Sequence, residues 1–294
     1  MADRSRKSRR ASPRTRSRTP LLAVDVGNTD TVVGRFRGGE LEGFWRLTTG
    51  RSTSDELRIA LELLVRESMV GWGSIVCSVV PILTEHWRDA LRAVTGRAPV
   101  ELKASNAGIP VEVDEPRAVG PDRLANSFAA LRIYGAPAIV VDVGTATTLD
   151  CVSKSGAYVG GAIAPGLVTA SEELFRRAAR LHRVDLRRPR RALGKTTDEC
   201  LRVGVLWGNA GLVDALVRRV RAELGGRPKV IATGGLAPLV IDEVPFIDAH
   251  EPWLTLIGLR LVWERNHGAG ARADSFRGDA AHAETDVTAG SDPR

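Results

Sequence analysis

The sequence predicts an α/β fold of two similar halves that face each other across a cleft, and one repeated pattern carries this prediction. At residues 21–29, LLAVDVGNT, an apolar run leads directly into an Asp, a Gly and a hydroxyl residue. At residues 139–148, IVVDVGTATT, the same pattern returns. A short apolar run followed by turn residues is typical of a buried strand that ends in a tight turn. Two copies of this design indicate two similar half-domains.

The first half is expected to start as a β-meander and to continue with helices. The Gly-Asn turn after residue 26 supplies the backbone angles that a hairpin needs. Thr53-Ser54-Asp55-Glu56 matches a capping box, so a helix should begin there, and apolar residues at helical spacing follow it. The predicted elements are strands over 21–26, 31–36, 41–48 and 74–80 and helices over 54–65 and 82–94.

A helix that begins near Gly120-Pro121-Asp122-Arg123 is expected to connect the two halves, after a Pro-rich loop over 109–120. A basic, Pro-containing linker, residues 187–191, interrupts the second half and is interpreted as a solvated run. The predicted elements of this half are strands over 138–143, 149–153, 157–163 and 230–232 and helices over 168–181, 197–224 and 252–266.

Charge and composition divide the chain into four parts. The 294 residues are 43% apolar, which is enough for two cores. Residues 1–20 contain eight Lys or Arg and one Asp, which accounts for the whole net charge of +7. We therefore expect a disordered basic arm over 1–20, a first half over 21–135, a second half over 136–266 and a disordered tail over 267–294. The formally neutral folded body gives no reason to expect nucleic acid as a partner.

Several classes of protein are disfavoured by what the sequence lacks. Cys77, Cys151 and Cys200 are too few and too scattered for a disulfide framework, which favours a cytoplasmic protein. No apolar run is long enough to predict a membrane span or a secretory signal. There is no G-x-G-x-x-G, G-x-S-x-G or metal-binding His/Cys spacing, and Gly194-Lys195-Thr196 lacks the first Gly of a P-loop.

Three Gly- and Thr-rich turns that follow strands are the strongest chemical signal. They are Asp25-Val26-Gly27-Asn28-Thr29, Asp142-Val143-Gly144-Thr145 and Ala232-Thr233-Gly234-Gly235. Small residues let backbone N–H groups approach a phosphate, and hydroxyls can donate to it. Each turn alone is weak evidence, but together they suggest a phosphate-binding cleft.

In their order along the chain, these motifs resemble the type III pantothenate kinase family, within the superfold of acetate and sugar kinases, Hsp70 and actin. The resemblance covers nearly all of residues 21–266. It rests on the three turns, on Gly120-Pro121-Asp122-Arg123 with Asn126, and on further blocks at 160–166, 194–197, 232–237 and 254–260. It implies two ribonuclease H-like (actin-like ATPase) half-domains around a nucleotide cleft. One departure is His250-Glu251-Pro252, where the family generally has an Asp before the Pro.

The resemblance also implies an activity, the phosphorylation of pantothenate by ATP to 4'-phosphopantothenate, the first step of coenzyme A synthesis. It implies a homodimer whose active site lies close to the subunit interface, with Mg²⁺ and a monovalent cation, K⁺ or NH₄⁺, as cofactors. It assigns Asp122 as the proton acceptor and Asp142 as the ligand of the monovalent cation. The implied ATP-binding residues are Asp25, Val26, Gly27, Asn28, Thr29, Asp30, Thr31, Val32 and Thr145. The implied pantothenate-binding residues are Gly120, Pro121, Asp122, Arg123 and Thr197.

Elementary chemistry supports these roles to different degrees. A carboxylate near the attacking hydroxyl can accept its proton, but an Asp after Pro at a helix start is also a typical N-cap, so Asp122 has two interpretations. Arg123 is unfavourably placed in a first helical turn, which favours contact with a carboxylate or phosphate. Asp25 suits Mg²⁺, either directly or through water. Asp142 needs a partner if buried, and either a cation or neighbouring N–H groups would serve.

The alternative to an enzyme is a non-catalytic accessory or regulatory relative of the same fold. The simultaneous presence of Asp25, Asp122, Arg123, Asp142 and Thr145 argues against it, because a binding module has no need of the whole set.

Overall fold

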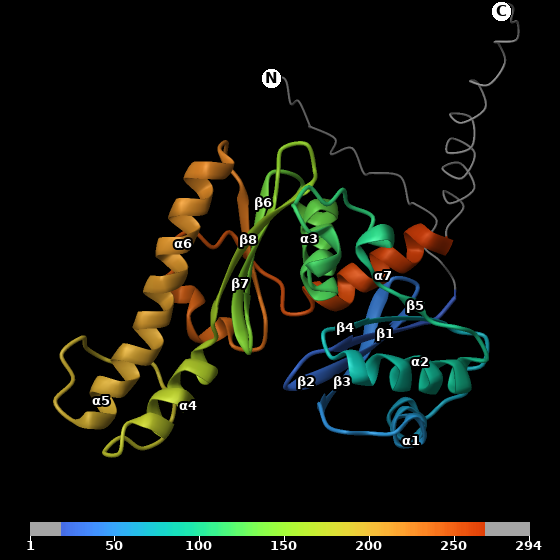
Figure 1. The fold of residues 1–294 in the computed structure, drawn as a ribbon, viewed down its shortest axis with the longest axis horizontal. Helices are drawn as coiled ribbons and strands as arrows, with labels where there is room; N and C mark the ends of the chain where they lie inside the picture. The colour runs from blue at the N-terminus through green and yellow to red at the C-terminus, as the bar shows by residue number, and fades with distance from the viewer. Residues whose placement is uncertain (1–18, 268–294) are drawn as a thin grey trace, which may run out of the picture.

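The computed structural model describes residues 19–267. The predicted arm, apart from Thr19 and Pro20, and the predicted tail beyond His267 lie outside the described residues. Within this range two five-stranded sheets are flanked and separated by helices (Figure 1).

Both sheets have the same strand order, which confirms the prediction of two similar ribonuclease H-like halves. In each sheet three antiparallel strands form a meander, and a parallel strand joins the other side of the first one. The first sheet contains, in spatial order, β3 (Glu40–Thr48), β2 (Asp30–Arg37), β1 (Leu21–Val26), β4 (Gly73–Ser78) and β5 (Val100–Glu101). The second contains β8 (Tyr158–Pro165), β7 (Ala146–Val152), β6 (Ala138–Val143), β9 (Lys229–Thr233) and β10 (Ala249–His250).

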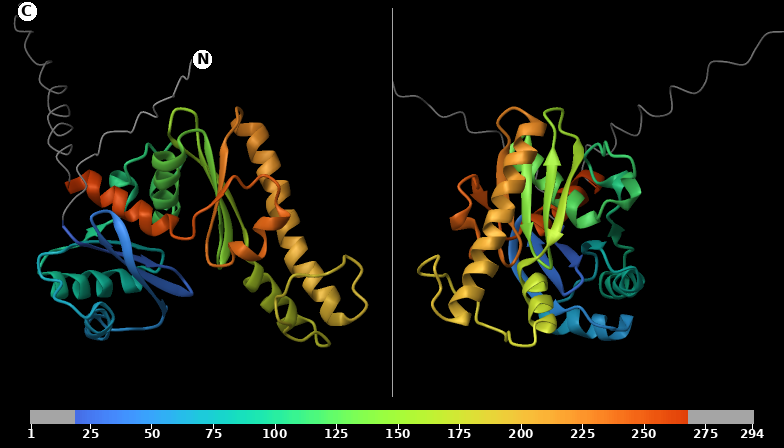
Figure 2. Two further views of the ribbon diagram at one scale, coloured as in Figure 1. Left: turned by 180° about the vertical axis from the view of Figure 1, so that it is seen from behind. Right: turned by 60° about the vertical axis from the view of Figure 1, so that its left-hand side comes forward.

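The helices form three layers around the two sheets (Figures 1 and 2). Helices α1 (Ser54–Val65) and α2 (Pro81–Thr95) cover the outer face of the first sheet, and α1 begins with the predicted capping box between Thr53 and Glu56. Helices α3 (Pro121–Tyr134) and α7 (Leu254–His267) fill the layer between the sheets. The outer face of the second sheet carries α4 (Leu167–Arg177), α5 (Thr197–Arg202) and α6 (Gly208–Leu224). Short 3₁₀ turns occur at Ala104–Asn106, Pro116–Ala118, Ala237–Leu239 and Ile241–Glu243.

The central layer ties the halves together. Helix α7 follows the second sheet in sequence but packs along α3 and against β1 and β4 of the first sheet. Gly258 of α7 allows this close crossing, because a Cβ there would lie 2.1 Å from the carbonyl oxygen of Ala125 in α3. A buried cluster in this layer contains residues from both sheets and from both helices.

The long helix predicted over 197–224 is interrupted by a π-helical segment at Val203–Trp207, which joins α5 to α6. By length and composition this stretch, Thr197–Leu224, is the one helix in the described part of the chain that could cross a membrane, and 33% of its most apolar window is buried. The buried side of the stretch includes Leu206, Val213 and Val217 and packs on the second sheet, as an amphipathic helix of a globular fold does.

Candidate active site

A cleft of about 670 Å³ lies between the halves and is lined by both sheets and by the start of α7. The loop between β1 and β2 forms one wall, where the N–H of Gly27 donates to the carbonyl of Asp30 at 3.0 Å. A Cβ at Gly27 would lie 2.8 Å from that carbonyl oxygen, so this tight turn requires Gly. Of the eight residues expected to bind ATP here, six line the cleft, and the other two, Val26 and Thr31, are buried behind it.

The loop between β6 and β7 forms the facing wall and is built in the same way. Its Gly144 N–H donates to the carbonyl of Ala146 at 3.0 Å. The two walls meet where the hydroxyls of Thr29 and Thr145 lie 2.9 Å apart. The structure thus brings the predicted Thr145 directly to the predicted ATP loop.

The third predicted turn closes the cleft beside Asp142. Gly234 has φ = +91°, and a Cβ there would lie 2.4 Å from Oδ1 of Asp142. The following backbone returns to the second sheet, because the N–H of Leu236 donates to the carbonyl of Val143 at 3.1 Å. Only a Gly fits this backbone conformation so close to a carboxylate.

Strand alternation aims Asp25 and Asp142 at the same central space. Side chains two residues apart on a strand point to the same face of the sheet. Leu21 and Ala23, on the same face of β1 as Asp25, belong to the buried cluster of the central layer. Ala138 and Val140, on the same face of β6 as Asp142, belong to it as well. Each Asp is the next-to-last residue of its strand, lies on the central side of its sheet and lines the cleft.

The two carboxylates receive different hydrogen bonds. The thiol of Cys77 on β4 donates to Oδ1 of Asp25, with sulfur and oxygen 3.2 Å apart. Nδ2 of Asn126 on α3 donates to Oδ2 of Asp142 at 3.1 Å, and the Asn126 Oδ1 accepts from the hydroxyl of Thr255 at 2.9 Å. This relay from α7 fixes the orientation of the Asn126 amide.

Asp122 interacts electrostatically with both carboxylates. Burial raises the pKa of Asp25 to about 7 and that of Asp142 to about 6, and in each case the charge of Asp122 adds to the rise. The bonds from Cys77 and Asn126 act in the opposite direction. Three carboxylates that repel one another in a desolvated space favour a bound cation.

Asp122 is the second residue of α3 and is half-buried. Its Oδ1 accepts a hydrogen bond from the N–H of Arg123 at 2.9 Å. Burial raises the pKa of Asp122, and this hydrogen bond lowers it. Gly120 leaves room for this carboxylate, because a Cβ at Gly120 would lie 2.4 Å from the Oδ1 of Asp122. Gly120, Pro121 and Asp122 therefore form one compact helix start.

Arg123 is held by a buried acid that the sequence analysis did not single out. Its Nε donates to Oδ1 of Asp150 at 2.6 Å, and its Nη2 donates to the carbonyl of Leu149 at 3.3 Å. The Asp150 side chain is fully buried and also accepts from the hydroxyls of Thr148 and Tyr158. Burial raises the pKa of Asp150, and the Arg123 guanidinium opposes that rise. Nη1 of Arg123 takes part in none of these bonds.

Comparison with known proteins identifies the family. The model of type III pantothenate kinase matches residues 21–219. The type III pantothenate kinase of Thermobifida fusca is 46% identical over 256 residues, which cover 84% of this chain and 99% of the relative. That of Parafrankia sp. is 49% identical over 249 residues, with 84% and 98% covered. The chain belongs to the type III pantothenate kinase family. The family predicted from the sequence is therefore confirmed, and with it the class of enzyme, a kinase.

A solved structure supports the fold independently. A conserved protein of the Baf family from Campylobacter jejuni matches with a TM-score of 0.55 and 19% identity, covering 84% of this chain and 98% of that chain. At this identity the likeness concerns the fold alone.

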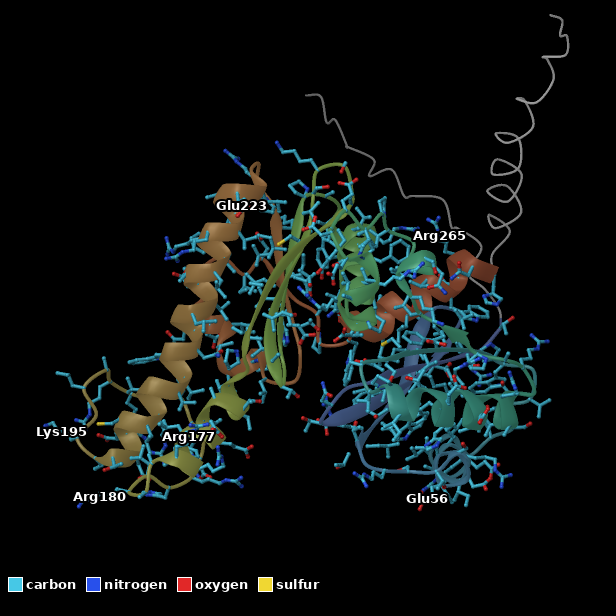
Figure 3. All side chains as sticks on the ribbon, viewed as in Figure 1. Glu56, Arg177, Arg180, Lys195, Glu223 and Arg265 are labelled. Carbon is cyan, nitrogen blue, oxygen red and sulfur yellow. The ribbon has the colours of Figure 1, made fainter. Side chains whose placement is uncertain are left out.

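None of the five predicted substrate residues is among those that line the central cleft, and Thr197 also lies apart from the other four. It begins α5 and lines a separate cavity of about 540 Å³ between α4, α5 and α6, which shares no lining residue with the central cleft. Lys195, two residues earlier, lies at the far end of the second half, away from α3 (Figure 3). Within one chain, Thr197 therefore does not join Gly120, Asp122 and Arg123.

The cleft also contains residues that the sequence analysis did not assign to the site. They are Arg46, Val168, Thr169, Glu172, Leu236, Pro252, Trp253, Thr255 and Leu256. The signals of the first four are weak, because they come from an edge strand and from the first turns of a helix. Leu236, Thr255 and Leu256 lie within blocks of the family resemblance that carried no assigned role. Trp253 gives the clearest new contact, since its ring lies 4.0 Å, centroid to centroid, from that of Phe44 in the first half.

A metal ion in this cleft would have to be held by one carboxylate of the protein together with oxygen atoms of a bound molecule. Among residues 19–267 no group of three or more His, Cys, Asp or Glu is arranged to hold a metal ion. Asp25 and Asp142 are nevertheless suitable single ligands, because both line the cleft and both lack a cationic partner strong enough to offset their desolvation.

Proposed function

We propose that the protein transfers the γ-phosphoryl group of ATP to the primary hydroxyl of pantothenate and so forms 4'-phosphopantothenate for coenzyme A synthesis. The convergence of Asp25 and Asp142 on a cleft walled by two Gly/Thr loops carries this proposal, together with the charge of Asp122, which acts on both carboxylates, and the family of the chain. Phosphoryl transfer depends on positioning and charge stabilisation more than on covalent catalysis, and two facing loops of N–H and hydroxyl donors are suited to it.

In this mechanism Asp122 accepts the proton of the attacking hydroxyl. Its raised pKa makes it a stronger base than an ordinary Asp, and its place in the first turn of α3, with a hydrogen bond from the N–H of Arg123, orients its carboxylate. Its alternative role, as an acid that only stabilises the helix start, makes a different prediction, because a purely structural Asp would affect folding and leave the turnover of the folded protein unchanged.

Asp25 and Asp142 fit the two cations that the family implies. A magnesium ion at Asp25 would neutralise charge on the phosphates, and a monovalent cation at Asp142 would offset that carboxylate. The chain contributes the orientation of both carboxylates, through Cys77 on one side and the Asn126–Thr255 relay on the other.

Arg123 is assigned to the carboxylate of pantothenate. The ion pair with Asp150 fixes the plane of the guanidinium, and Nη1 is left to meet a substrate group. Gly120 and Pro121 would border the same part of the substrate.

The position of Thr197 favours a homodimer. In one chain it is remote from Asp122, so its role in binding pantothenate requires the cavity between α4, α5 and α6 to meet the cleft of a second copy. The apolar lining of that cavity, which includes Leu174, Leu181 and Leu212, offers a surface for that copy. A cytoplasmic location agrees with this assignment.

The decisive experiment measures pantothenate-dependent ADP formation, with and without K⁺, in the intact protein, Asp122→Asn and Asp55→Asn. Asp55 is a matched control, because it is also the second residue of its helix but is exposed. We expect Asp122→Asn to lower kcat about 10²–10⁴-fold, the usual contribution of a general base, and Asp55→Asn to retain normal turnover. Absence of pantothenate-dependent turnover in the intact protein would favour the non-catalytic alternative. Equal turnover of the two variants would remove Asp122 as the base.

A further inference from the structure

The cleft proposed to bind ATP has an unusual balance of charge. Among the described residues that line it, four carry carboxylates, namely Asp25, Asp30, Asp142 and Glu172, and Arg46 is the one with a cationic side chain. A nucleoside triphosphate adds several negative charges to this space, and transfer of its terminal phosphoryl group needs positive charge where negative charge develops. The lining therefore makes Arg46 the side chain best suited to that task.

Arg46 is held by one exposed ion pair that a ligand could displace. It lies on β3 opposite Val32 of β2, and its side chain is 48% exposed. Nη1 donates to Oδ2 of Asp30 at 3.0 Å, in the loop expected to bind phosphates. Exposed ion pairs of this kind are weak, so a phosphate could replace Asp30 as the acceptor. The fork of a guanidinium also matches two phosphate oxygens better than an ammonium group does.

The same guanidinium reaches the second half. The Cβ position of Gly235 lies 3.6 Å from Nη2 and 3.7 Å from Nη1 of Arg46. Gly235 belongs to the Thr233–Gly235 turn, on the opposite side of the cleft from β3. Arg46 thus spans the opening between the two halves, next to the loops that would hold the phosphates.

We propose that Arg46 binds the β- and γ-phosphates of the nucleotide, exchanging Asp30 for phosphate oxygens and holding the two halves together around them. The identity of the ligand as a nucleoside triphosphate rests on the proposed function. The placement of Arg46 between the Asp30 loop and the Gly235 turn does not.

Equilibrium binding without pantothenate tests this inference. Mg²⁺ complexes of a non-hydrolysable ATP analogue and of ADP, and AMP alone, are titrated into the intact protein, Arg46→Ala, Arg46→Lys and Arg37→Ala. Arg37 is the matched control, because it is a paired Arg of the same sheet with 44% exposure but lies outside the cleft lining. Arg46→Ala should weaken the triphosphate analogue about 10–100-fold, as loss of charged hydrogen bonds does, and should leave AMP unchanged. The affinity of Arg46→Lys for the triphosphate analogue should lie between those of Arg46→Ala and the intact protein, and the affinity of Arg37→Ala should equal that of the intact protein.

Turnover provides a second measurement. Arg46→Ala should lower kcat/KM for ATP while the KM for pantothenate stays the same. Equal triphosphate affinity in Arg46→Ala and Arg37→Ala, or an equal loss for AMP, would overturn the proposal. If the intact protein binds the triphosphate through Arg46 but shows no pantothenate-dependent turnover, the proposed function fails and the role of Arg46 stands. If turnover is normal and Arg46→Ala binds the triphosphate analogue as tightly as the intact protein does, the proposed function stands and the role of Arg46 fails. If the intact protein does not bind the analogue, the proposed function and the role of Arg46 both fail.

Discussion

The two Asp-containing turns at the heart of the cleft share a backbone plan and differ in what supports their carboxylates. Asp25 and Asp142 are the next-to-last residues of equivalent strands. Each is paired in register with a residue of the parallel neighbour, Cys77 on β4 and Thr233 on β9. In the first half that neighbour supplies the hydrogen bond, from a thiol. In the second half the bond comes from Asn126 on the connecting helix.

This difference distinguishes the two sites at which cations are proposed to bind. Burial and repulsion by Asp122 raise the pKa of both carboxylates, to about 7 for Asp25 and about 6 for Asp142, and the charge of Asp142 adds to the rise at Asp25. The thiol of Cys77 and the amide of Asn126 each oppose the rise at the carboxylate that they contact. We propose Mg²⁺ at Asp25 and the monovalent cation at Asp142, two carboxylates that differ in the donors that support them. The following predictions test this division of roles.

The largest expected effect on turnover in this comparison comes from removing the carboxylate charge of Asp25 or of Asp142. Asp25→Asn and Asp142→Asn should each lower kcat about 10²–10³-fold, as loss of one group that stabilises transition-state charge typically does. The residual activity should differ between them. Asp142→Asn should lose its response to K⁺ and keep its response to Mg²⁺, and Asp25→Asn should show the opposite. Turnover measured against each cation separately decides this, and an identical pattern in both variants would contradict the division.

Much of this comparison could be predicted from the sequence because its signals are local. A short apolar run that ends in Asp-x-Gly indicates a strand and its turn, and the return of this pattern at residues 139–148 predicted two halves that face each other across a cleft. The packing of α7 onto the first sheet could not be predicted, because it depends on a close crossing at Gly258 that no local pattern indicates. The edge strands β5 and β10 were also missed, since two residues carry no periodicity.

Arg123 differs from the two turns because its partner is a buried acid, Asp150. Loss of charged hydrogen bonds in Asp150→Asn should release the guanidinium and lower kcat/KM for pantothenate about 10–100-fold. Pantothenol, in which an alcohol replaces the carboxylate, should be affected much less, because it lacks the group that Arg123 is proposed to bind. The ratio of the two substrates is the measurement. Equal losses for both would mean that Asp150 supports the fold and not the recognition of the carboxylate.

Asp150 also shows what limited prediction of the site. An acid inside an apolar strand, Thr148-Leu149-Asp150-Cys151, signals that a buried partner is needed, but the sequence does not say which one. The partner lies 27 residues away, at the start of α3. Arg46 was missed for a similar reason, since an Arg on an edge strand is ordinary until the fold brings it to the cleft.

The third prediction concerns stability without ligands. The folded protein keeps protons on Asp25 and Asp142 up to about pH 7 and 6, whereas an unfolded Asp releases its proton near pH 4. Folding therefore takes up protons between these values, and the free energy of unfolding should fall as pH rises through this window. Asp25→Asn and Asp142→Asn should each be more stable than the intact protein at pH 8, by on the order of 1–3 kcal/mol.

Urea unfolding at pH 5 and pH 8, without nucleotide, K⁺ or Mg²⁺, measures this effect. Asp55→Asn, which changes an exposed acid, is the control and should show no comparable gain. The gain should also shrink when Mg²⁺ and an ATP analogue are added, because bound cations stabilise the ionised carboxylates. A loss of stability in both variants at pH 8 would contradict the picture of uncompensated charge.

The smallest expected effect comes from Cys77, the weaker of the two supporting donors. Its buried thiol lowers the pKa of Asp25, so Cys77→Ala should raise that pKa by roughly a few tenths of a unit, and Cys77→Ser, which supplies a stronger donor, should lower it. Binding of a Mg²⁺–ATP analogue should require ionised Asp25, so the pH midpoint of binding should shift upwards in Cys77→Ala and downwards in Cys77→Ser. Cys151→Ala is the control, because Cys151 is also a buried cysteine but lies in the core behind the second sheet. Shifts in the same direction for Cys77→Ala and Cys77→Ser would show that the thiol acts through packing rather than through its hydrogen bond to Asp25.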